Sequence, residues 1–153
     1  IISSVGIDEG NTLKEKLNIA VHCIDFMKKL KKTPKIATLS YARPGDYGRS
    51  EEINQSLDDA KKLTQLIEKH TNQKIENSCV LIDQAIKNKC NILIAPNGIV
   101  GNTIFRTLVL LNSWPSFGAI TFGIDDIYID TSRDQSREGY LRSLELAYKL
   151  AKL

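Results

Sequence analysis

Residues 91–103 read NILIAPNGIVGNT, an apolar strand that passes through a Gly- and Asn-rich bend directly into an amphipathic helix, Ile104 to Leu111. In α/β proteins such a strand delivers the chain to the carboxyl edge of the sheet. Glycines there let the backbone approach a ligand, and the N–H groups that begin the next helix attract an anion. Asn102 or Thr103 equally fits the simpler role of a helix cap. The stretch therefore predicts a strand–turn–helix unit, and its neighbours favour an anion site at the turn.

The bulk composition is that of one globular domain. The chain has 153 residues, of which 42% are hydrophobic and 25% charged, enough to bury a substantial core. No apolar run reaches the ~20 residues that cross a bilayer, and the net charge of +3 is not gathered into a basic stripe. We expect a single α/β domain, residues 1–153, that binds neither membranes nor nucleic acids.

The three cysteines are Cys23, Cys79 and Cys90, and the chain has only two histidines. Their wide spacing matches no metal-ligand motif and no disulfide framework. We expect reduced thiols, no metal site and a cytoplasmic protein. The chain begins with Ile1 and shows no signal peptide, so we expect it to be the later part of a longer polypeptide.

Helical and strand patterns alternate in the first two thirds of the chain. Apolar residues recur at helical spacing from Leu13 to Leu30 and again from Ile53 to Ile67, behind a helix start at Ser50. Ile36–Ser40 between them reads as a buried strand, and Cys79–Ile86 shows weaker helical spacing.

The last third continues the alternation. Residues 117–124 and 127–129 resemble strands, and Ser136 begins a final helix with one apolar face. That face is formed by Leu141, Leu144, Ala147, Tyr148 and Ala151. The whole pattern predicts a layered α/β fold with a largely parallel sheet, whose ligand site lies beyond the strand ends.

Three loops follow predicted strands: residues 41–50, 96–103 and 125–136. The first two lie at one sheet edge if their strands are parallel. Together the loops supply groups that suit phosphate, pyrophosphate or carboxylate recognition, namely Arg43, Arg49, Asn102, Ser132, Arg133 and Arg137. Each arginine equally fits a solvated surface position, and Asp130 or Asp134 fits the role of a salt-bridge partner of Arg133.

The order of these motifs resembles the phosphate acetyl/butyryltransferase family. Residues 91–96, then Gly101-Asn102, Gly118, Gly123 and the segment 130–133 (DTSR) are similar to that family's strand, P-D-x-x-x-G-N turn and D-L-S-R-G segment. Lys35–Tyr41 is similar to its V-A-L-L-S-F strand, and the resemblance covers nearly the whole chain from Val5.

Within that superfamily, residues 5–10 (VGIDEG) and 40–46 (SYARPGD) look most like the methanogen proteins called methanogenesis marker protein 4. These are also labelled methyltransferase-related subunit X. The resemblance implies an isocitrate/isopropylmalate-dehydrogenase-like fold with two lobes, a cleft for coenzyme A and acyl phosphate, and a homodimer.

The loops and the resemblance together define a candidate site. We expect catalysis by Ser132, Arg133 and Glu138. We expect binding of coenzyme A or another phosphate-bearing ligand by Arg43, Gly45, Asn97, Gly98, Gly101, Asn102, Thr103 and Asp130.

Departures from the family pattern shape the functional prediction. Asp134 stands where the family has glycine, Gly139 where it has an acidic residue, and Ile129 where it has asparagine. These changes favour a methanogenesis-associated protein that binds an anionic ligand and is methyltransferase-related by label. The alternative is an active acyltransferase that moves an acyl group between phosphate and coenzyme A. Whether the chain is an enzyme stays open, and NAD-dependent oxidation is least favoured because no G-x-G-x-x-G fingerprint is present.

Overall fold

The computed structural model describes residues 1–153, which form two compact units, Ile1–Asn102 and Thr103–Leu153. The first unit contains β1 (Ile2–Ser3), α1 (Leu13–Lys29), β2 (Ile36–Leu39), α2 (Glu51–Thr71), β3 (Glu76–Cys79), α3 (Ile82–Lys87), β4 (Ile92–Ile94) and the start of α4 (Gly98–Phe105). The second contains the end of α4, π-helical turns (Arg106–Leu111), β5 (Ala119–Ile120), β6 (Ile129–Asp130) and α5 (Arg137–Leu150). None of the helices combines the length and apolar character that crossing a membrane requires.

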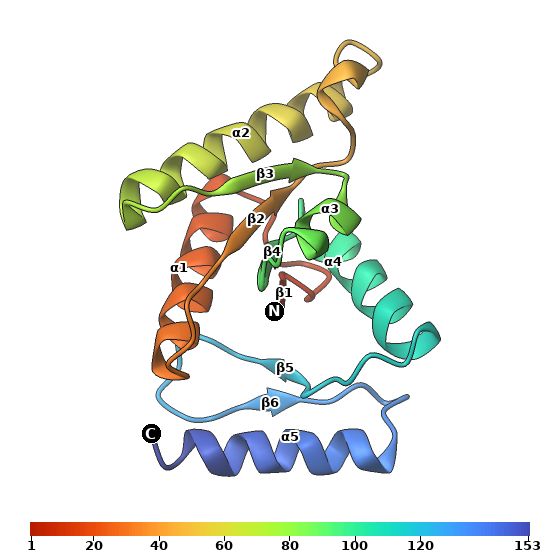
Figure 1. Cartoon of the computed structure of the whole chain (residues 1–153). Helices are drawn as coiled ribbons and strands as arrows, with labels where there is room; N and C mark the ends of the chain where they lie inside the picture. The colour runs from red at the N-terminus through yellow and green to blue at the C-terminus, as the bar shows by residue number, and fades with distance from the viewer. The chain divides into compact units, whose positions relative to one another are not determined.

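The first unit is built on a four-stranded parallel sheet in the order β1-β4-β2-β3. The steps from β1 to β2 and from β2 to β3 run in one direction, so right-handed crossovers place α1 and α2 on the same face. The step back to β4 places α3 on the other face, as Figure 1 shows. The predicted α/β fold with a largely parallel sheet is confirmed.

The two long helices begin and end at the residues their sequences indicate. Thr12 and Glu15 form a capping box at the start of α1, and the Ser50 hydroxyl accepts the Ile53 N–H at the start of α2. The predicted apolar faces are buried between helices and sheet. The buried residues are Ala20, Cys23, Ile24 and Met27 on α1, and Leu57, Ala60, Leu63 and Ile67 on α2. All three cysteines are free thiols.

The strand–turn–helix unit differs from its prediction in where the helix starts. α4 begins at Gly98, six residues before Ile104, and Asn97 caps it by accepting the Val100 N–H at 3.0 Å. Asn102 and Thr103 therefore lie inside the helix, and their predicted capping role is wrong. The bend is helical because its glycines allow the helix to lie against the backbone that follows β1.

Two glycines of α4 lack room for a side chain. A Cβ at Gly98 would lie 1.5 Å from the carbonyl oxygen of Gly6, and one at Gly101 would lie 1.8 Å from that of Ser4. Both obstacles are backbone atoms, which cannot rotate away as a side chain does. The spacing of these glycines is therefore explained by packing.

β3 was not predicted, and Cys79 belongs to this strand rather than to a helix. The sequence of β3, ENSC, is polar, and it pairs with β2 at the edge of the sheet. α3 starts only at Ile82, because the chain turns at Cys79 with a φ of 53°. The weak helical spacing was thus correct for the second half of its segment alone.

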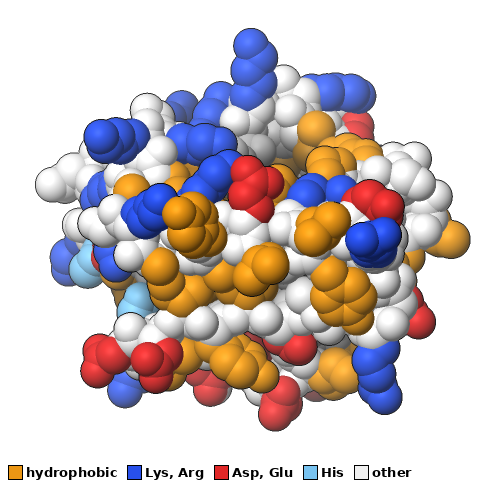
Figure 2. All heavy atoms as spheres, turned by 90° about the horizontal axis from the view of Figure 1, so that it is seen from below, with side chains coloured by type: hydrophobic (Ala, Val, Ile, Leu, Met, Phe, Trp, Pro, Cys, Tyr) orange, Lys and Arg blue, Asp and Glu red, His pale blue; other side chains and the backbone are white.

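The second unit has short strands and an exposed helix face. β5 and β6 form a two-residue antiparallel ladder, much shorter than the predicted strands. On α5 the buried positions are Gly139 and Ser143, while Leu141, Leu144 and Tyr148 are 56%, 68% and 61% exposed. The predicted apolar face of α5 therefore exists and is largely exposed, and Figure 2 shows exposed hydrophobic side chains on one face of the molecule. Every buried hydrophobic residue of the chain lies at or before Ala95.

We predict that Gly98→Ala destabilises the first unit by ~2 kcal/mol or more, because overpacking against fixed backbone displaces it. Gly45→Ala is the matched control, since nothing lies within 4 Å of a Cβ at that position. Urea unfolding of both variants measures the difference. Equal midpoints for the two variants would contradict the packing argument.

Candidate functional site

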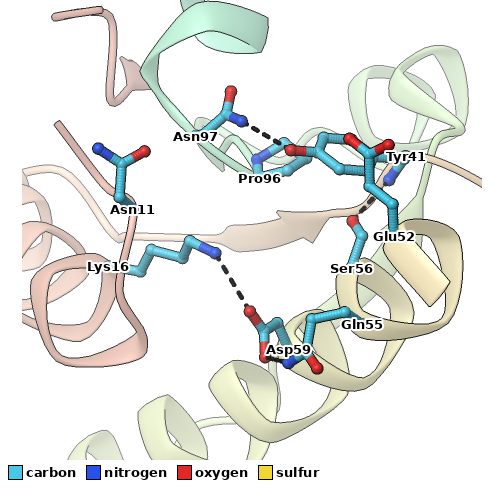
Figure 3. A pocket seen from close by; sticks show the side chains of 9 residues that line it. All are labelled: Asn11, Lys16, Tyr41, Glu52, Gln55, Ser56, Asp59, Pro96 and Asn97. Atoms are coloured by element: carbon cyan, nitrogen blue, oxygen red, sulfur yellow. Dashed lines mark hydrogen bonds and ion pairs between the residues drawn. The ribbon is translucent and has the colours of Figure 1, made fainter. Parts of the chain in front are cut away.

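A hollow of about 270 Å³ lies at the carboxyl ends of β2 and β4 in the first unit. Tyr41 follows β2, Pro96 and Asn97 follow β4, and the remaining lining comes from the loop before α1 and from the N-terminal halves of α1 and α2 (Figure 3). Those remaining residues are Asn11, Lys16, Glu52, Gln55, Ser56 and Asp59. The volume is near the lower end for small-molecule sites.

The position of this hollow follows from the topology. The chain leaves β2 toward α2 on one face of the sheet and leaves β4 toward α4, while β2 and β4 are neighbours in the sheet. A crevice opens where adjacent strands send their chains in different directions, and open α/β sheets bind ligands at this point.

A hydrogen-bond network fixes the wall between the two strand ends. The Asn97 amide donates to the Tyr41 hydroxyl oxygen at 2.6 Å, and its own oxygen is held by Val100. The Tyr41 N–H donates to the Ser56 hydroxyl at 3.0 Å, which ties the loop to α2. Tyr41 and Ser56 each keep their hydroxyl hydrogen free to donate into the hollow.

Lys16 and Asp59 face each other across the floor of the hollow. The Lys16 side chain is only 9% exposed, and its Nζ lies 3.7 Å from Asp59 Oδ2, too far for a hydrogen bond. The other Asp59 oxygen accepts from Gln55 Nε2 at 2.7 Å. The Lys16 side chain is thus mostly buried, and its ammonium group is left with hydrogens to donate into the hollow.

The Tyr41 phenol is held in its neutral form. Burial, and then the carboxylates of Glu52 and Asp59, raise the pKa of Tyr41 above its ordinary value, because both disfavour the phenolate. At neutral pH the hydroxyl is therefore a hydrogen-bond donor that also accepts from Asn97.

Comparison with known proteins places the sequence among methanogen proteins. Over 133 residues it is 37% identical to "Putative methyltransferase mtx subunit X" of Methanosarcina mazei, a match that covers 86% of this chain and 46% of the relative. It is 32% identical over 151 residues to an "Uncharacterized methyltransferase" of Methanocaldococcus jannaschii, covering 95% of this chain and 61% of the relative. The chain is thus similar to these methanogen proteins over most of its own length. It spans about half the length of the relatives it matches, and no family model matches it.

The fold of the chain resembles that of phosphotransacetylases. The solved EutD phosphotransacetylase of Staphylococcus aureus superimposes with a TM-score of 0.69 at 19% sequence identity, over 96% of this chain and 48% of the other. At this identity the likeness concerns the fold alone. The predicted phosphotransacetylase-like fold is confirmed, as is the predicted similarity to methanogen proteins labelled as methyltransferases.

Of the site residues predicted in the first unit, Asn97 alone lines the hollow. Arg43 lies two residues beyond Tyr41, where its side chain is exposed and forms no ion pair within the protein, and Gly45 lies in the following 3₁₀ turn. The Asn102 amide donates to the Val5 carbonyl at 3.1 Å. Packing explains Gly98, Gly101 and Asn102, and their roles in ligand binding stay predictions.

The N-terminal amides of α4 are engaged within the protein. The Gly98 N–H donates to the Glu9 carbonyl at 3.0 Å, and the Val100 N–H is taken by Asn97. The free amides expected for an anion are therefore not found at these two positions. An anion at this helix end has to displace an internal acceptor.

The predicted residues of the second unit lie on β6, its following turn and α5, apart from Thr103 on α4. Asp130 is exposed on β6, and Ser132 is half-buried, with its hydroxyl accepting the Asp134 N–H at 3.3 Å. Arg133 and Glu138 are exposed and form no ion pair. Asp134 is paired with Arg106 at 3.2 Å, so the extra acid of this segment is neutralised by a neighbour of its own unit.

Most residues that line the hollow, including Lys16, Ser56 and Asp59, are not among the predicted site residues. A signal was present for two of them, because Lys16 lies four residues before Ala20 and Ser56 four before Ala60, on the same buried stripes. A polar residue on the buried face of a helix, near the helix start and beside a strand end, indicates a cavity with a polar lining. Asp59 lies next to the stripe and carries no such signal.

We predict that Glu52→Gln lowers the pKa of Tyr41 part of the way to its ordinary value, since it removes one of the two carboxylates that disfavour the phenolate. Tyrosinate absorbance titrations, compared with Tyr41→Phe to isolate this phenol, measure the shift. Glu51→Gln changes the adjacent exposed acid, which does not line the hollow, and serves as the control. An equal effect of the two variants would argue against the geometry of this wall.

Proposed function

We propose that this chain is the ligand-binding part of a methanogenesis-associated protein and that it binds a small anionic ligand, of phosphate or coenzyme type, at the carboxyl edge of its parallel sheet. The observation that supports this is the hollow at the switch point of the sheet, adjoined by a loop whose Arg43 guanidinium has no partner in the protein. The proposal includes the relatives' methyltransferase label, a homodimer and a cytoplasmic location.

The donor set fits a phosphate-bearing ligand. An exposed guanidinium offers two parallel N–H bonds to a phosphate or carboxylate, and Arg43 gives up no internal ion pair to make them. Arg49 on the same loop differs, because its Nε is already bound to Asp46 Oδ1 at 3.1 Å. Coenzyme A is one ligand with the required phosphates, and Arg43 is the residue that would hold one of them.

We predict that Arg43→Ala raises the Kd for coenzyme A about tenfold or more, equivalent to ~1.4 kcal/mol, whereas Arg49→Ala leaves it within about twofold. Isothermal titration of the protein with coenzyme A, acetyl phosphate and inorganic phosphate measures both. Thermal melting with the same compounds gives a second readout, because a bound ligand raises the melting temperature by mass action.

The contrary outcomes are clear. No response to any of the three compounds removes the anionic ligand from the proposal. Equal losses in Arg43→Ala and Arg49→Ala show that loop structure, not a guanidinium contact, governs binding.

A second candidate function is acyl transfer between phosphate and coenzyme A. It is favoured by the exposed, unpaired Arg133 beside Ser132, and by the pairing of Asp134 with Arg106, which offsets the charge that would repel a phosphate. In this reaction the coenzyme A sulfur attacks the acyl carbonyl, the bond from that carbon to the phosphate oxygen breaks, and phosphate leaves. The thiol proton passes to a base, for which Glu138 is the candidate.

Under this alternative, Arg133→Ala lowers kcat/KM for acetyl transfer by ~100-fold, because it removes a cation that stabilises developing charge. Arg137→Ala, an exposed arginine four positions later, is the matched control and retains activity. Formation of acetyl-coenzyme A from acetyl phosphate measures the rate. If the unmodified protein binds coenzyme A but forms no acetyl-coenzyme A, acyl transfer is excluded and only the binding function remains.

A further inference from the structure

The hollow is lined by one cation and two carboxylates. Lys16 provides the positive charge, and Asp59 and Glu52 provide the negative ones. Glu52 has no ion-pair partner in the protein, and Asp59 shares only the long contact with Lys16. A phosphate inside the hollow would therefore meet two like charges for one opposite charge, in surroundings that screen them less than bulk water does.

The Lys16 ammonium nevertheless has hydrogens to donate into the hollow. The nearest carboxylate oxygen is that of Asp59, 3.7 Å away, which is beyond hydrogen-bond distance. Figure 3 shows the side chain extending from α1 toward the centre of the hollow. A neutral carbonyl oxygen placed there would satisfy Lys16 without adding charge.

The other residues of the lining supply both hydrogen-bond donors and hydrogen-bond acceptors. The hydroxyls of Tyr41 and Ser56 have hydrogens to donate, because each oxygen is already an acceptor within the protein. Glu52 and the Asn11 side-chain oxygen have lone pairs to accept, since the Asn11 amide nitrogen is bonded to the Asp8 carbonyl. The hollow thus matches a group that presents a carbonyl oxygen and an N–H or O–H close together.

We infer that the hollow binds an uncharged amide- or hydroxyl-bearing segment, whose carbonyl oxygen accepts from Lys16 and whose N–H or O–H donates to Asp59 or Glu52. This inference rests on the proposed function, because it takes the hollow as the ligand site. It adds that the anionic group and a neutral segment of the ligand bind at different places. The anionic group stays outside on the Arg43 loop, and the neutral polar segment enters. A small anion alone is the wrong occupant for the interior.

The test uses three small probes: N-acetylethanolamine, acetate and inorganic phosphate. Protein-observed NMR titrations follow the backbone amides of residues 11, 41, 56 and 97. N-acetylethanolamine should shift these amides with a Kd about tenfold lower than that of acetate. Lys16→Met should weaken N-acetylethanolamine binding about tenfold, whereas Lys14→Met, which changes an exposed lysine of the same helix, should have no effect.

A second variant tests the charge balance without removing Lys16. Asp59→Asn should strengthen acetate binding severalfold, because it removes one repelling carboxylate while leaving the ammonium in place. Tighter binding of acetate or phosphate than of N-acetylethanolamine to the parent hollow would overturn the inference, as would amide binding that Lys16→Met leaves unchanged. Failure of the proposed function appears elsewhere, in coenzyme A titrations that do not depend on Arg43.

Discussion

The close approach of two α4 glycines to the backbone after β1 holds the ligand edge of the sheet together. Gly98 and Gly101 lie directly against the carbonyls of Gly6 and Ser4, and the Gly98 N–H is bonded to the Glu9 carbonyl. This contact joins the strand-connecting loop that carries Asn11 to the turn that carries Asn97, so it sets two walls of the hollow. Because both partners are backbone, the spacing does not depend on the rotamer of any side chain.

The sheet imposes a second constraint, because polar residues can follow its buried strands only at the carboxyl edge. Residues of β2 and β4 are wholly buried, as parallel strands covered on both faces must be,. The chain becomes polar at the residues that follow these strands, and the loop before α1 and the N-terminal halves of α1 and α2 contribute the rest.

The sequence predicted elements where packing and local pattern agree. α1 and α2 have apolar residues at the helical period and side-chain caps, and β2 and β4 are short apolar runs. These four elements are therefore predictable from the sequence. β3 is polar because it is an edge strand, and α5 has a helical stripe whose exposure the sequence pattern alone does not reveal. The glycines of residues 98–101 resemble a ligand loop because close approach to a ligand and close approach to backbone require the same residue. Lys16 and Asp59 lie 43 positions apart in the sequence, and only the fold makes them neighbours.

The two units do not support binding and catalysis equally. The first unit has a core of its own and a hollow whose walls are fixed by hydrogen bonds, which is sufficient for recognition. Catalytic groups must be held to within about half an ångström by packed surroundings, and residues 103–153 contain no buried hydrophobic side chain. Ser132 is held there by its turn and by a 3.4 Å contact between its carbonyl and the Tyr140 hydroxyl. The first unit is therefore better packed to hold side chains in fixed positions than the second, in which the buried residues are small or polar.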